Sequence, residues 1–124
     1  LMDRRETQRY HHAILGGDFN LLPSSFAYSM LDERGKSYYN PLGTELSPIL
    51  EAFDSIPSSE SMHGENHPKW FTYSPNHVSS ALPDRSIDYL FYTENLTLLQ
   101  QKVRSEDTLQ ISDHLPVIGV FALP

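Results

Sequence analysis

The sequence contains no cysteine, which excludes disulfide bonds and thiolate chemistry for this chain. It also lacks any apolar run that approaches the roughly 20 residues of a membrane-spanning helix. The first residues, Leu1 to Glu6, mix acids with bases and contain no apolar stretch of the kind found in a signal peptide. These absences predict a soluble chain without a transmembrane segment, and they favour a cytoplasmic location.

Basic side chains are scarce, with 9 lysines and arginines against 16 acidic residues and a net charge of -7. A non-specific nucleic-acid binder usually presents a basic face, so this balance argues mildly against tight binding to polyanions. An excess of carboxylates could instead be gathered around a divalent cation. With 124 residues, the chain has the size of one domain or part of one.

Apolar patterns and capping residues predict a series of short strands and helices. The expected strands are 13–15, ending at Gly16-Gly17, then 85–92, 96–103 and 117–121. A short helix is expected to open at Ser24-Ser25, and another over 47–53 with Ser47 as its cap. The segments 32–44, 56–69 and 74–84 are expected to be loops, and 1–9 the tail of a helix.

The most informative stretch is 111–117, where Asp113 and His114 stand side by side just before an apolar strand. Pro116 cannot donate to a sheet ladder, so it marks the entry to that strand. The acid and the imidazole are therefore expected at a strand end, where a sheet can direct side chains into a cleft. The alternative is a simple turn capped by the aspartate.

A second informative stretch is Gly16-Gly17-Asp18-Phe19-Asn20, which directly follows a predicted strand. Asp18 and Asn20 are two residues apart, so in an extended chain their side chains point to one side while Phe19 turns to the core. A carboxylate and an amide directed together suit a metal ion or phosphate oxygens. An Asx-rich turn after a strand explains the same residues equally well.

The third stretch is the apolar segment 85–92, which contains a single acid in its interior, Asp88. A lone aspartate in an apolar strand is costly unless it has a partner. His114 is an available partner, so we expect Asp88 and His114 to meet.

Two further segments carry weaker signals. His63 and His67 are four residues apart, but the Gly64-Glu65-Asn66 between them does not favour a helix, so a zinc site there is the less favoured reading. The aromatic run Trp70 to Tyr73 suits a core strand, and its alternative role is that Trp70 or Tyr73 borders a substrate cleft.

The three stretches occur in the order Gly-Asp-Phe-Asn (17–20), Ser-Ile-Asp-Tyr (86–89) and Ser-Asp-His-Leu-Pro-Val (112–117). This set resembles the C-terminal half of the endonuclease/exonuclease/phosphatase (DNase I-like) superfamily. The resemblance implies an α+β fold with two mixed sheets packed as a sandwich and flanked by helices. It also implies a divalent-metal-dependent hydrolase of phosphate esters, that is, a phosphodiesterase, nuclease or phosphatase.

The resemblance also implies a role for each matched position. Asp18 would position or deprotonate the attacking water, or handle the leaving-group proton, and Asn20 would hold that acid or a phosphate oxygen. Asp88 would fix the tautomer of His114, which would donate to a phosphate oxygen in the transition state. Asp18, Asn20 and Asp113 would bind Mg²⁺ or Mn²⁺.

The resemblance leaves the family's N-terminal half, with its metal-binding glutamate, unmatched. We therefore expect residues 1–124 to form the C-terminal part of such a domain, paired with the missing half or with another copy of the chain. The alternative is a non-catalytic fragment or interaction module that keeps the fold without turnover. The substrate is expected to be a nucleic acid, a phospholipid head group or a phosphorylated small molecule, selected by the loops 32–44, 56–69 and 74–84.

Overall fold

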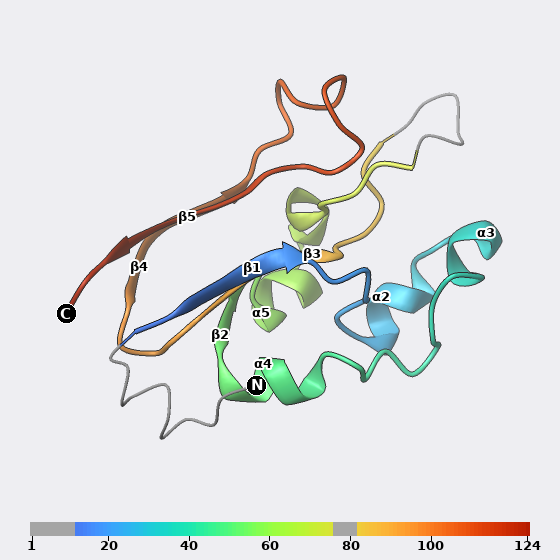
Figure 1. Ribbon diagram of the computed structural model, residues 1–124. Coiled ribbons are helices and arrows are strands. Elements are labelled where there is room, and N and C mark those ends of the chain that lie inside the picture. Colours follow the sequence, from blue (N-terminus) through green and yellow to red (C-terminus); the bar gives the residue numbers. More distant parts are fainter. Residues whose placement is uncertain (1–11, 76–81) are drawn as a thin grey trace.

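The computed structural model describes residues 12–75 and 82–124, so the predicted helix tail over 1–9 lies outside the described residues. Ten short helices and strands follow one another along the described part of the chain (Figure 1). They are β1 (Ile14–Asp18), α2 (Ser25–Ser29), α3 (Glu33–Lys36), α4 (Ser47–Ala52), β2 (Asp54–Ile56), α5 (Ser59–His63), the 3₁₀ helix η1 (His67–Trp70), β3 (Asp88–Tyr92), β4 (Thr97–Val103) and β5 (Val117–Ala122).

The strands form two separate antiparallel sheets. β3 lies at the centre of the first sheet, between β1 and β2, and β4 pairs with β5 in the second. The chain is therefore an α+β protein with two sheets and short helices, as expected for part of a DNase I-like sandwich. The expectation of mixed sheets is wrong for the described residues, because every strand pair there is antiparallel.

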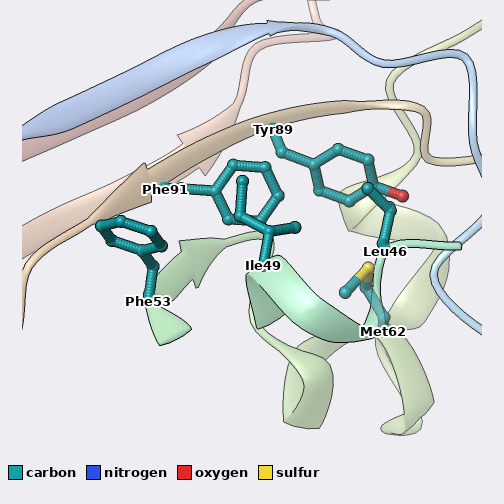
Figure 2. Close-up of a cluster of buried hydrophobic side chains, with 6 residues drawn as sticks. All are labelled: Leu46, Ile49, Phe53, Met62, Tyr89 and Phe91. Carbon is teal, nitrogen blue, oxygen red and sulfur yellow. The ribbon is translucent and has the colours of Figure 1, made fainter. Parts of the chain in front are cut away.

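One face of the three-stranded sheet is covered by helices. Tyr89 and Phe91 of β3 point from the strand towards α4 and α5, where they meet Ile49, Phe53 and Met62 (Figure 2). Phe91 is fully buried and Tyr89 is 1% exposed, which agrees with the alternation read from the sequence. Each such aromatic ring stabilises the fold by roughly 1.5–3 kcal/mol through burial. This cluster holds the central strand in place.

The second sheet packs against the first through a smaller cluster. Ile56 of β2 and Tyr92 of β3 are buried there, with Val117 and Phe121 of β5 partly buried against them. Gly119 makes the close approach possible, because a Cβ at that position would lie 2.7 Å from Cδ1 of Ile56. β4 and β5 otherwise form a ribbon that extends away from the helical part of the molecule (Figure 1).

Several local predictions were right in kind and displaced in position. Ser24 caps α2 as expected, by accepting from the Ala27 backbone N–H. The cap of α4 is Leu46 rather than Ser47, and its side chain makes no capping hydrogen bond. β1 runs through the two glycines to Asp18, because pairing with β3 continues to that residue. The strand expected over 85–92 begins only at Asp88.

Two segments expected to be loops contain helices. Asp32 accepts from the Gly35 backbone N–H and so caps α3 within 32–44. Ser58 caps α5 in the same way, and η1 follows it within 56–69. α3 and α5 are too short to show helical periodicity, so their capping residues were the only local signal for them. The expected strand over 70–73 is absent, since Trp70 ends η1 and Tyr73 makes only isolated bridges.

Several apolar side chains remain outside the two cores. Ile14 and Leu15 of β1 are 52% and 43% exposed, and Val120 of β5 is 42% exposed. Among the helices described, none is long and apolar enough to cross a bilayer.

Candidate functional site

The site is built where β1 ends and β3 begins. Asp18 and Asp88 are directly paired across these two antiparallel strands. Phe19 continues the pairing by donating its backbone N–H to the Ile87 carbonyl at 3.0 Å. Its ring packs edge-on against Phe91 at 5.2 Å between centroids, which confirms the prediction that Phe19 turns to the core. The anchored phenyl ring fixes the backbone on either side of it.

Asn20 sits in a turn that also engages Asp18. Its backbone has a φ of 49°, in the left-handed region that asparagine tolerates better than most residues. The Asn20 backbone N–H donates to Oδ1 of Asp18 at 2.8 Å, so the Asx turn considered from the sequence is present. The turn keeps both polar side chains at one cleft, which Asp18 and Asn20 both line.

His114 is held by backbone pairing with the segment 72–74. Leu115 donates to the Thr72 carbonyl at 2.7 Å, and Ser74 donates to the Asp113 carbonyl at 2.7 Å. Leu115 is 3% exposed, so it anchors the stretch in the core. The Tyr73 ring lies 5.1 Å from the imidazole, centroid to centroid. These contacts direct His114 towards β3.

The expected contact between Asp88 and His114 is present. Nδ1 of His114 lies 3.1 and 3.0 Å from the two carboxylate oxygens of Asp88. An ionised carboxylate only accepts, so the Nδ1 proton is donated to it and the ring orientation is fixed. Nε2 then faces Asp18, 3.7 Å from its Oδ2. The ligand atoms of the three side chains lie within 4.8 Å of one another, so they form a compact group.

The imidazole lies in a strongly negative environment. Partial burial lowers the pKa of His114, but the hydrogen bond to Asp88 and the charges of Asp88, Asp18 and Asp113 together raise it above its ordinary value. The raised pKa favours the imidazolium, which carries a proton on Nε2 as well as on Nδ1. His114 is thereby prepared to donate a hydrogen bond into the cleft.

The cleft has a volume of about 570 Å³ and brings together most of the predicted site residues. Asp18, Asn20, Tyr73, Asp113 and His114 all line it. Asp88 lies behind His114, with its side chain only 14% exposed.

Four polar lining residues were missed by sequence reasoning, namely Arg34, Tyr38, Tyr39 and Arg85. Three of them lie on or directly after α3, in the segment expected to be a loop. Two adjacent tyrosines in a polar stretch were the available signal. Arg85 is 4% exposed, and its guanidinium donates to both carboxylate oxygens of Asp84, at 2.7 and 3.1 Å.

The tightest group of potential cation ligands among the described residues is Asp18, Asp88 and His114, whose ligand atoms lie within 4.8 Å of one another. Asp113 and Asn20 line the same cleft but do not belong to this tight group. Carboxylate oxygens are the ligands that Mg²⁺ and Mn²⁺ prefer, so the donor chemistry fits a hard divalent ion. This tight group shares Asp18 with the predicted set of Asp18, Asn20 and Asp113, and it includes Asp88 because Asp88 lies opposite Asp18 on the neighbouring strand.

Other candidate residues lie elsewhere. Trp70 does not line the cleft and packs against the cluster of Ile56 and Tyr92. His63 and His67 form no cation site among the residues described, and each ring Nδ1 lies within hydrogen-bonding distance of a backbone carbonyl one turn earlier. The Phe26 ring packs against both imidazoles.

Comparison with known families supports the resemblance read from the sequence. A family model described as Endonuclease/Exonuclease/phosphatase family matches residues 3–114, which is most of the chain. No curated protein and no solved structure shows a significant match. The chain therefore belongs to the endonuclease/exonuclease/phosphatase family, whose members are generally hydrolases that act on phosphoesters with divalent metals.

Proposed function

We propose that this member of the endonuclease/exonuclease/phosphatase family provides the catalytic side chains of a divalent-metal-dependent phosphoester hydrolase. The observation that carries the proposal is the compact group of Asp88, His114 and Asp18 at the cleft. A largely buried acid that orients an imidazole, with a second acid near the other ring nitrogen, is an arrangement suited to acid–base chemistry.

In this proposal His114 stabilises charge on the phosphoryl group. Its Nε2–H donates to a non-bridging phosphate oxygen, and the bond strengthens as negative charge grows in the transition state. Asp88 keeps the ring oriented so that no reorganisation is needed when the reaction occurs. Asp88 does not contact substrate in this scheme and acts through His114.

Asp18 is the proposed base that positions and deprotonates the attacking water. Its side chain is about half exposed, and Oδ1 is already held by the Asn20 backbone N–H. Oδ2 therefore remains directed towards the cleft and the His114 ring. Asn20 is proposed to donate its side-chain amide to a phosphate oxygen, which would place the substrate between Asn20 and His114.

Mg²⁺ or Mn²⁺ is the proposed cofactor. Asp18 and Asp113 would hold it, while Asp88 stays on the imidazole, where both of its oxygens are engaged. Asn20 is better suited to substrate, because its Oδ1 already accepts from the Tyr39 hydroxyl. When bound, the ion would neutralise charge on the phosphoryl oxygens as a Lewis acid.

The residues that line the cleft indicate what kind of substrate it suits. Arg34 and three tyrosines line the same cleft as Asp18, Asp113 and His114, so the cleft offers groups for an anion as well as for a cation. A phosphate ester that carries a further polar group or a ring fits a cleft lined in this way. Nucleic acid, a phospholipid head group and a phosphorylated small molecule are all candidate substrates. In each case Tyr73 and the part of the cleft formed by α3 would contact the leaving group.

We also propose that residues 1–124 supply the C-terminal part of the catalytic domain. The exposed apolar residues of β1 and β5 are suited to packing against further strands. An N-terminal half of the same domain, or another copy of this chain, would cover them and add oxygen ligands for the ion.

Hydrolysis of bis(p-nitrophenyl) phosphate by the protein that carries this chain tests the proposal. Activity should require Mg²⁺ or Mn²⁺, vanish with a chelator, and fall on the order of a hundredfold in His114→Ala. His63→Ala is the matched control, since His63 is exposed and outside the cleft. Turnover that survives His114→Ala would contradict the mechanism, and absence of hydrolysis by the wild type would favour a non-catalytic role.

A further inference from the structure

The side-chain amide of Asn20 is engaged at one end only. Its Oδ1 accepts from the Tyr39 hydroxyl at 3.1 Å, whereas no hydrogen-bond partner of its Nδ2 is found in ranges 12–75 and 82–124. An amide held through its oxygen presents its two N–H donors on the opposite side. In an exposed side chain at the cleft rim, that orientation is not set by packing, so it depends on the tyrosine.

Tyr39 is itself held firmly enough to set that orientation. Its ring packs against the buried cluster of Leu22, Leu31 and Ile87. The Arg85 guanidinium lies over the same ring, with Cζ 5.6 Å from the centroid, in cation–π geometry. The hydroxyl is therefore fixed in space by the ring that carries it.

Arg85 in turn has little freedom. Asp84 binds its guanidinium through two hydrogen bonds, and the Tyr73 ring lies on it with a separation of 5.1 Å. The glycine in α3 also borders the group, because a Cβ at Gly35 would lie 3.2 Å from Nη2. With its carboxylate partner so close, this arginine is better suited to holding two aromatic rings than to binding a phosphate.

We propose that Tyr39 is a positioning residue that turns the Asn20 amide donors towards the substrate, and that Arg85 holds its ring in place for this purpose. The inference deepens the proposed function and rests on it, because the amide is useful only where an anionic oxygen is bound. Tyr39 itself need not touch the substrate.

Tyr39→Phe removes one oxygen and keeps the ring on the cluster and on Arg85, so the fold should survive. We expect kcat for a phosphodiester to fall about tenfold with little change in KM, which is less than the hundredfold or more expected for removing a donor outright by Asn20→Ala. Tyr28→Phe is the matched control, since Tyr28 packs on the same cluster outside the cleft. It should leave turnover unchanged.

The double variant separates positioning from a general structural effect. If Tyr39 acts through Asn20, Tyr39→Phe should have no further effect in the Asn20→Ala background. A loss in the double variant that equals the product of the two single losses would overturn the inference. Full activity of Tyr39→Phe would also overturn it, provided that His114→Ala lowers the activity of the same protein. In that last case the proposed function stands and the positioning role fails.

A second readout does not need turnover. In proton–nitrogen spectra, the Asn20 side-chain amide pair, assigned by its absence in Asn20→Ala, should shift in Tyr39→Phe and stay in place in Tyr28→Phe. An unmoved Asn20 pair in Tyr39→Phe would overturn the inference. If the wild type shows no hydrolysis, the proposed function fails and this shift alone decides the positioning of the amide.

Discussion

The two sheets use similar apolar residues and reach very different degrees of burial. β3 carries Tyr89 and Phe91 into a core closed by α4 and α5, so both rings lose nearly all contact with water. β5 reads in sequence as a buried strand, yet Val120 is 42% exposed and no residue of the strand is fully buried. An apolar pattern therefore indicates which side chains a strand can bury. The elements packed on the strand decide which of those side chains are buried.

The site lies at the junction of these two regions. Asp88 belongs to the well-packed strand, and His114 belongs to the segment that leads into the exposed ribbon. A rigid acid is therefore paired with an imidazole that relies on backbone pairing with 72–74 for its position. Stability and catalysis should respond differently to changes on the two sides.

Phe91→Ala should give the largest effect on stability. It removes a fully buried ring and leaves a cavity, so the free energy of unfolding should fall by about 3–5 kcal/mol. Phe121→Ala makes the same chemical change in β5, where a partly buried ring leaves no closed cavity, and should cost roughly 1–2 kcal/mol. Denaturant unfolding of both variants tests the comparison. Equal losses would show that the ribbon is as well packed as the helical core.

Asp88→Asn should impair turnover through the same step as His114→Ala. Each single change should lower kcat on the order of a hundredfold, and the double variant should be no worse than the His114→Ala single variant. The reason is that Asp88 acts only by orienting the imidazole that it binds at 3.0 Å. Steady-state kinetics on the four proteins measures this. Multiplying losses would show that Asp88 has a direct role, for example on the metal.

Gly119→Ala should loosen the junction between the sheets. The added methyl would lie 2.7 Å from Ile56 Cδ1 and 2.9 Å from the Phe121 ring, so side chains in both sheets must shift. Overpacking of this kind costs roughly 1–3 kcal/mol. Gly17→Ala is the control, because nothing lies within 4 Å of a Cβ built there. Thermal unfolding of the two variants should differ clearly, and equal midpoints would mean that the sheets separate easily.

The smallest expected effect is on the pH dependence of stability. His114 has a raised pKa in the folded state despite the opposing effect of burial, because Asp88, Asp18 and Asp113 favour its charged form. Its contribution is therefore complete below the ordinary value of about 6.5 and is lost as pH rises through the raised folded value. Unfolding from about pH 5 to about pH 9 should show this loss in the wild type and less of it in Asp88→Asn. Identical profiles would contradict the interaction.

Much of the candidate site could be predicted from the sequence because its signals are local. A lone acid in an apolar strand needs a partner, and His114 was the available one. A glycine pair followed by Asp-Phe-Asn marks a strand end with polar side chains on one side. The strands expected over 96–103 and 117–121 are also present, to within one residue at each boundary.

Tertiary structure alone decided the rest of the cleft. Arg85 and Tyr39 lie far apart in sequence and meet because α3 folds back beside the segment that precedes β3. Strand register, which local sequence does not give, set Asp88 opposite Asp18 and so formed the tight group with His114. Local sequence specifies the polarity and flexibility of each short segment. Packing between the elements decides which segments meet, and these elements are too short to be recognised from sequence periodicity.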